Sequence, residues 1–177
     1  MFEKFTRATR RVVLDAVIEA EREHADQVTP EHLLLALLHA TRSGPVLADA
    51  GLTREVLVEA FAAAHRRGGL TDADTEALGA LGIDVTAIVE RVEQVHGRNA
   101  LAHPRRRRLP MSHIPFAPTA KAVLGRALRQ ARERRDRHIG DEHLLLALAT
   151  ATGPATQALT DHGLTYPELR TRLPKAA

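Results

Sequence analysis

The chain has 177 residues and is 44% apolar, which is enough for one hydrophobic core or two small ones. It has no cysteine, which excludes disulfides and thiolate chemistry, and only 3% aromatic residues, so its core must be built mainly from aliphatic side chains that favour helices. The net charge of +3 divides unevenly: residues 1–97 sum to −6 (10 basic, 16 acidic), residues 98–138 to +10 (12 basic, 2 acidic) and residues 139–177 to −1 (3 basic, 4 acidic).

The first part of the chain carries two helix signals. Apolar residues at spacings of three and four predict an amphipathic helix, and they are Val12, Val13, Ala16, Val17 and Ala20. A second helix is predicted to open at Thr29-Pro30-Glu31. Threonine is a good N-cap, proline suits the first helical position, and the glutamate carboxylate lies at the positive end of the helix dipole.

The middle of the chain holds an insertion and a linker. The triplet Gly82-Ile83-Asp84 and the amphipathic segment after it resemble Gly51-Leu52-Thr53 and the segment that follows, which indicates that a terminal helix is locally duplicated within an insertion at about 66–97. Residues 98–115 contain three prolines and no apolar periodicity, so we expect an exposed linker. Its basic patch consists of Arg105, Arg106, Arg107 and Arg108.

An internal repeat decides the architecture. The heptapeptide Glu-His-Leu-Leu-Leu-Ala-Leu occurs at Glu31–Leu37 and again, 111 positions later, at Glu142–Leu148. The same offset aligns Phe5 with Phe116 and Val28 with Ile139 without a gap. We therefore predict an all-α fold with two similar units, repeat one at 1–97 with its insertion and repeat two at 116–177, joined by the linker at 98–115.

The ordered motifs resemble a known family. Phe5-Thr6, the sequence from Thr29 to Leu37, and the following Gly-Pro and Gly-Leu-Thr are similar to the Clp amino-terminal repeat, and His113–Lys121 is especially close to ClpC. The resemblance implies two repeats of about four helices each, packed with pseudo-twofold symmetry as one domain that receives substrates and adaptors for an ATP-driven unfoldase–protease. No phosphate-binding Gly-x-x-x-x-Gly-Lys-Ser/Thr loop is found, so the expectation is a stand-alone, non-enzymatic N-domain protein of the kind seen in actinobacteria, without a cofactor.

The resemblance also implies a ligand site. In the family, phosphoarginine is held by a glutamate that takes the guanidinium, a nearby threonine and backbone amides at helix N-termini. The matching residues are Thr6 and Glu31 in repeat one and Glu142 in repeat two, where Ala117 replaces the threonine. The alternative is that both glutamates only stabilise helix N-termini.

A peptide groove is a second implied site. Phe2, Val13 and Phe116 match apolar positions around the groove that binds cyclic-peptide antibiotics in ClpC, and Lys121 lies in the same region. Phe116 could instead belong to the core, because it starts an amphipathic helix. Both implied sites, the one for phosphoarginine and the one for a peptide, make the chain a binding module for protein clients, adaptors or Clp subunits.

The remaining polar residues favour simpler roles. His32 and His143 lack further convergent ligands, so we expect capping or packing rather than a metal site. The arginine-rich segment 98–138 suggests a rival function, binding of nucleic acid or another polyanion. Aromatic residues do not interleave with the arginines, which disfavours nucleic acid relative to acidic protein surfaces. No run of 18 apolar residues and no signal-peptide core are present, so a cytoplasmic protein without membrane contact is expected.

Overall fold

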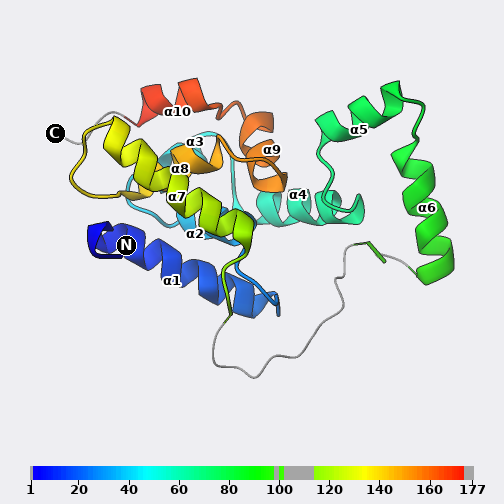
Figure 1. The fold of residues 1–177 in the computed structure, drawn as a ribbon, viewed down its shortest axis with the longest axis horizontal. Helices are drawn as coiled ribbons and strands as arrows, with labels where there is room; N and C mark the ends of the chain where they lie inside the picture. The colour runs from blue at the N-terminus through cyan, green and yellow to red at the C-terminus, as the bar shows by residue number, and fades with distance from the viewer. Residues whose placement is uncertain (1, 98–99, 102–113, 174–177) are drawn as a thin grey trace.

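The structure is a computed structural model that describes residues 2–97, 100–101 and 114–173. Within these residues the chain forms one short 3-10 helix, ten α-helices and no strand longer than an isolated bridge (Figure 1). The helices are η1 Phe2–Lys4, α1 Arg7–Arg22, α2 Pro30–Leu37, α3 Ser43–Asp49, α4 Arg54–Arg66, α5 Asp72–Ala80, α6 Val85–His96, α7 Pro118–Glu133, α8 Asp141–Leu148, α9 Pro154–Asp161 and α10 Tyr166–Arg172. The predicted all-α class is confirmed.

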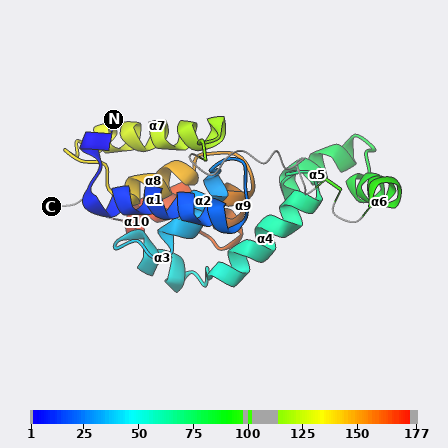
Figure 2. The ribbon, with the colours of Figure 1, turned by 90° about the horizontal axis from the view of Figure 1, so that it is seen from below.

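Eight helices form a body of two equivalent sets. Helices α1 to α4 and α7 to α10 follow the same order, and the heptapeptide forms α2 in the first set and α8 in the second. The two helices lie in the middle of the body (Figure 2). Their leucines are all buried: Leu33, Leu34, Leu35, Leu37, Leu144, Leu145, Leu146 and Leu148. A helix that is apolar on every side needs such a central place, and this explains why the heptapeptide recurs unchanged.

The two repeats are joined through their first residues. Phe5 forms a parallel bridge with Ile139, and Phe116 forms the equivalent bridge with Val28. The amide of Thr6 donates to the Ile139 carbonyl at 3.1 Å, and the amide of Ala117 donates to the Val28 carbonyl at 2.9 Å. The start of each repeat therefore lies beside the second helix of the other repeat, and this exchange makes the pair a single packed unit.

Two histidines cap the central helices. The backbone N–H of Thr29 donates to His32 Nδ1 and that of Gly140 donates to His143 Nδ1, both at 2.9 Å. The opposite ring nitrogen of His143 lies 3.0 Å from a carboxylate oxygen of Asp136. Each ring thus accepts at Nδ1, which leaves Nε2 to donate, and the histidine satisfies an amide that a helix N-terminus would leave without a partner. The expected structural role of both histidines agrees with this geometry.

Helices α5 and α6 stand apart from the body. They follow the end of α4 and extend away from the other helices (Figures 1 and 2). Arg67 Nη2 pairs with Asp72 Oδ1 at 2.9 Å, and the hydroxyl of Thr71 accepts from the amide of Asp74 at 3.1 Å, which fixes the start of α5. Residues 72–96 are called the arm below. The arm lies within residues 66–97, the range in which the sequence predicts an insertion.

None of the helices in the described ranges has the length and apolar character that a bilayer crossing requires.

Candidate functional site

The N-terminus of α2 presents Glu31 at the second helical position. Its side chain is 13% exposed, and Oε1 lies 3.7 Å from His65 Nε2, near the end of α4. Its other oxygen, Oε2, is buried and has no hydrogen-bond partner among the described residues. A buried carboxylate oxygen without a donor is costly. This position is therefore a place where an added donor would be stabilising.

Glu31 and His65 shift each other's pKa in the directions that favour a charged pair. Burial raises the pKa of Glu31, but the neighbouring His65 imidazole and Thr29 side chain outweigh it, so the pKa stays below its ordinary value. The contact with Glu31 raises the pKa of His65 above its ordinary value, against the opposing effect of burial. The α2 N-terminus thus holds a carboxylate beside an imidazole whose pKa is raised, and each group favours the charged form of the other.

The N-terminus of α8 is closed by the other repeat. Arg42 Nη1 donates to Glu142 Oε1 at 2.6 Å, and the Glu142 side chain is only 5% exposed. Asp141 Oδ2 accepts from the backbone amides of Arg42 at 3.0 Å and Ser43 at 2.9 Å. The first turn of α8 thereby caps the start of α3, and the Arg42 guanidinium covers Glu142.

The equivalent contacts do not form at α2. At the offset of 111 residues, Pro30 stands where Asp141 does, and Gly153 stands where Arg42 does. Proline has no carboxylate to cap α9, and glycine has no guanidinium to reach Glu31. The two glutamates therefore occupy the same helical position in different surroundings: Glu142 has a guanidinium partner from its own chain, and Glu31 has an imidazole at a longer distance.

The sequence repeat groups Thr6 with Glu31, but in the structure Thr6 lies beside the start of α8, the helix that carries Glu142. The Thr6 amide donates to the carbonyl of Ile139, the residue just before Gly140, which is the N-cap of α8. The Ala117 amide donates to the carbonyl of Val28, just before the N-cap of α2. Thr6 is the N-cap of α1, and its hydroxyl accepts from the Thr9 amide at 3.1 Å. The structure thus brings Thr6 to the Glu142 end and Ala117 to the Glu31 end, because the repeats exchange their first residues.

The residues predicted for the peptide groove have different environments. Val13 is buried in the core. Phe116 is partly buried and packs against the core, while Lys121 is exposed on the first turn of α7. Phe2 opens η1, and its side chain is outside what the structure describes. The apolar side chains that α1 does expose are Leu14 and Ile18. In the sequence, the signal for this exposed pair is its spacing of four residues, which places both side chains on one face of α1, next to the face that is buried in the core.

The arginine-rich segment divides into parts with different roles. Arg105, Arg106, Arg107 and Arg108 lie outside the described residues. On α7, Arg129 and Arg132 are exposed. Arg134, just after α7, is half-buried and donates to the Leu173 carbonyl at 2.8 Å. No group of histidine, aspartate and glutamate residues in the described part of the chain is arranged to hold a metal ion.

Comparison with known proteins places this geometry in a family. The model of the Clp repeat (R) N-terminal domain matches residues 4–71 and 68–162. The chain is 28% identical over 174 residues to a ClpA homolog, an ATP-binding subunit of the ATP-dependent Clp protease, from Cyanidium caldarium, and equally to the chloroplastic chaperone protein ClpC1 of Arabidopsis thaliana. Each alignment covers 98% of this chain but only 16% and 15% of the relative, so the chain spans about a sixth of their length.

Solved structures agree on the fold. The N-terminal domain of the chaperone ClpD from Arabidopsis thaliana has a TM-score of 0.54 at 20% identity, covering 98% of this chain and 94% of that one. The Hsp104 N-terminal domain from Candida albicans has a TM-score of 0.58 at 17% identity, with 96% and 89% covered. The two matched segments together span most of the described helices. The chain belongs to the Clp repeat N-terminal domain family.

Proposed function

We propose that the chain is a non-catalytic docking module for Clp-mediated proteolysis that binds an arginine side chain, in its phosphorylated form, at Glu31. The observation that carries the proposal is the Arg42–Glu142 pair, with its 2.6 Å contact. In this pair, the glutamate that opens the heptapeptide of repeat two binds a guanidinium of the same chain. Glu31 occupies the same helical position and has no arginine partner among the described residues, so it is the glutamate that we assign to an arginine from a client.

The surroundings of Glu31 suit both parts of phosphoarginine. The carboxylate offers Oε2, a buried acceptor without a donor, to the N–H groups of a guanidinium. A phosphate on the same side chain would be attracted by the positive end of the α2 dipole and by a protonated His65. The family pattern includes a threonine, but Ala117 lies at this end, so a hydroxyl from that position is not part of the proposed site.

Calorimetry with phosphoarginine tests the proposal. Glu31→Gln keeps the shape of the side chain and removes its charge, and we expect it to weaken binding by at least about tenfold, or ~1.4 kcal/mol. Glu55→Gln is the matched control, because Glu55 occupies the same position in the first turn of α4 and is exposed. Equal affinity in both variants, or no heat with the unmodified chain, would refute phosphoarginine binding at Glu31.

A peptide ligand is the second form of the same docking function. The residues that support it are Phe116 and Lys121, with the exposed Leu14 and Ile18 of α1 beside the buried stripe. A cyclic peptide with apolar side chains would compete with clients there. Titration of a cyclic peptide against Lys121→Ala and Leu14→Gln tests this form, and unchanged binding in both variants would exclude these residues.

The rival function is binding of a polyanion. It depends on Arg105 to Arg108, outside the described residues, together with the exposed Arg129 and Arg132 of α7. Retention of DNA that falls steeply with salt, and is lost when Arg105–Arg108 are replaced by alanine, would favour it. Co-purification with Clp unfoldase or protease subunits would favour the docking function instead.

A further inference from the structure

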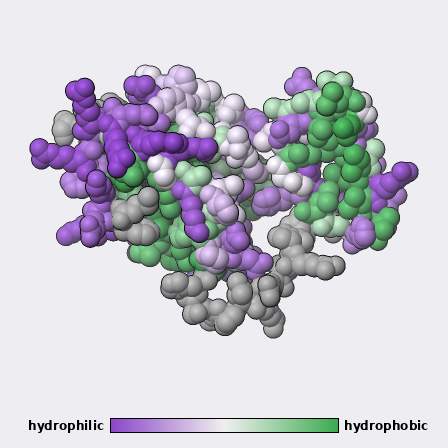
Figure 3. Space-filling model, viewed as in Figure 1, coloured by the Kyte–Doolittle hydropathy of each residue, from purple (hydrophilic) through white to green (hydrophobic). Residues whose placement is uncertain are grey.

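The arm exposes more apolar surface than a helical hairpin in solution would normally show. Leu81 is 77% exposed, Val95 71% and Ile88 49%. Figure 3 shows the resulting hydrophobic surface over α5 and α6, away from the body. Contiguous apolar surface of this kind is typical of a site of association with another molecule.

The arm repeats a structural unit that is buried twice in the body. In α3–α4 and in α9–α10, a helix, a glycine turn, an apolar residue and an N-cap lead into the next helix. The residue after the glycine donates back across the turn in each copy: Leu52 to the Leu47 carbonyl at 3.0 Å, Leu164 to the Leu159 carbonyl at 2.8 Å and Ile83 to the Leu78 carbonyl at 2.9 Å. Gly51 and Gly82 have φ of 76° and 79°, a conformation that glycine permits.

The three copies also share one apolar pattern. Four positions at the same spacing are apolar in every copy, and they are Leu47, Leu52, Leu57 and Phe61 in the first, Leu159, Leu164, Leu169 and Leu173 in the last, and Leu78, Ile83, Ile88 and Val92 in the arm. All members of the first and last sets are buried. In the arm every member is half-buried or exposed. Within the described part of the chain, the arm thus has the contact face of this unit without an element that covers it.

The body shows what kind of element covers such a face. The buried copies pack against the central helices and also against each other: α4 contacts α2 and α9, and α3 and α10 contact α8. Both central helices are lined with leucine. A leucine-rich helix is therefore one covering element that this apolar pattern fits, and the other is a second copy of the unit.

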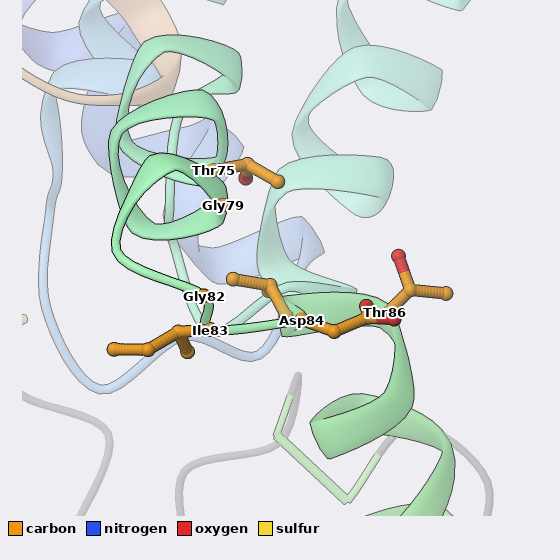
Figure 4. Close-up of a pocket in the computed structure, with 7 residues that line it drawn as sticks. Thr75, Gly79, Gly82, Ile83, Asp84 and Thr86 are labelled. Atoms are coloured by element: carbon orange, nitrogen blue, oxygen red, sulfur yellow. The ribbon is translucent and has the colours of Figure 1, made fainter.

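A hollow between α5 and α6 offers a place for part of that helix. It measures about 330 Å³ and is lined by residues that include Thr75, Gly79, Ile83 and Val85 (Figure 4). In Figure 4, Ile83 and Thr86 extend to opposite sides of the turn between the helices. Because Gly79 and Gly82 have no side chains, the hollow stays open toward the turn and could admit an apolar side chain.

The charge of the arm selects the partner. Residues 72–96 hold six acidic side chains and one arginine, a net of −5. Two arms brought together would repel each other, which disfavours a second copy of this chain. A covering helix with basic flanks would be attracted instead.

We propose that the arm is a docking surface for a partner protein that presents an amphipathic helix, leucine-rich on one face and basic on its flanks. The partner helix covers Ile83 and Ile88 in the way that α2 and α8 cover their equivalents, and its basic residues face the acidic side chains of the arm. This surface is separate from Glu31 and does not depend on arginine recognition.

The test uses the full chain and two labelled synthetic helices of the same leucine pattern, one with lysine and one with glutamate on the polar face. Fluorescence anisotropy should show binding of the lysine helix that weakens with salt. In a chain with both Leu81→Gln and Ile88→Gln, its affinity should fall at least about tenfold. Val58→Gln is the matched control, since Val58 is 41% exposed on α4, outside the arm, and it should change nothing.

Three results would overturn the proposal. Equal binding of the glutamate helix would remove the role of charge, and unchanged binding in the Leu81→Gln, Ile88→Gln chain would remove the role of the arm. Sedimentation showing a dimer that this double variant disrupts would make a second copy the occupant. Unchanged urea unfolding of the variants excludes loss of folding as an explanation of either effect.

Discussion

Truncation of Arg42 should destabilise the fold more than truncation of any exposed arginine. Arg42→Ala removes the guanidinium from Glu142 but keeps the backbone amide that Asp141 accepts, so the start of α3 stays capped. The Glu142 carboxylate, 5% exposed and already lacking a partner on Oε2, then loses the donor on Oε1. Breaking a buried pair costs ~3–5 kcal/mol. The Arg42 side chain is 32% exposed, and solvent screening lowers our expectation to about 2–3 kcal/mol.

Urea unfolding at neutral pH, followed by far-UV circular dichroism, measures this cost, because the chain has no tryptophan. Arg11→Ala is the matched control: Arg11 pairs with Asp15 at 2.9 Å, but its side chain is 73% exposed. We expect the control to cost no more than about 0.5 kcal/mol. Glu142→Gln provides a background without the buried charge, and there Arg42→Ala should cost less than about 1 kcal/mol.

Equal effects of Arg42→Ala and Arg11→Ala on the free energy of unfolding would show that the buried Arg42–Glu142 pair has no special contribution. An equal cost of Arg42→Ala with glutamine at position 142 would show that the cost comes from lost packing and not from an uncompensated charge.

Two further changes test the surroundings of the two glutamates. Folding raises the pKa of His65 and lowers that of Glu31, so their pair should contribute stability between the lowered pKa of Glu31 and the raised pKa of His65, and lose it at higher and lower pH. His65→Gln should therefore cost up to about 0.5 kcal/mol near pH 6 and less near pH 9, and equal unfolding free energies at both pH values would contradict this. A Cβ at position 140 would overlap the Glu142 carboxylate, so Gly140→Ala should destabilise by about 1–3 kcal/mol in the same urea assay. Gly125→Ala, in an open position inside α7, should instead stabilise by about 0.5–1 kcal/mol, and a shift of the same sign in both variants would contradict the argument.

Features with local causes could be predicted from the sequence. The aliphatic stripes place α1 and α7, the Thr-Pro-Glu start places α2, and the repeated heptapeptide implies two equivalent central helices. The arm could be predicted too, because its glycine turn copies Gly51-Leu52-Thr53. Each signal depends on residues within a few turns of one another, where periodicity and capping act.

Features of the site arise from contacts distant in the chain. Arg42 and Glu142 are separated by 100 residues, and no periodicity links them. Thr6 aligns with the unit that contains Glu31, yet the exchanged bridges bring it to the other end of the pair. Val13 is apolar at helical spacing, a pattern that describes a core stripe and a groove equally well. Only the packing of the two repeats distinguishes these possibilities.

The identical heptapeptides serve the core equally but differ in what surrounds their first residue. Their leucines face the same central environment in both repeats, so selection for packing alone would keep the sequences alike. The leading glutamates are distinguished by residues outside the heptapeptide: Asp141 holds the start of α3 and thereby positions Arg42 over Glu142. Because Pro30 and Gly153 cannot make these contacts around Glu31, the proposed arginine site occurs once per chain, and a titration with phosphoarginine should saturate at one equivalent.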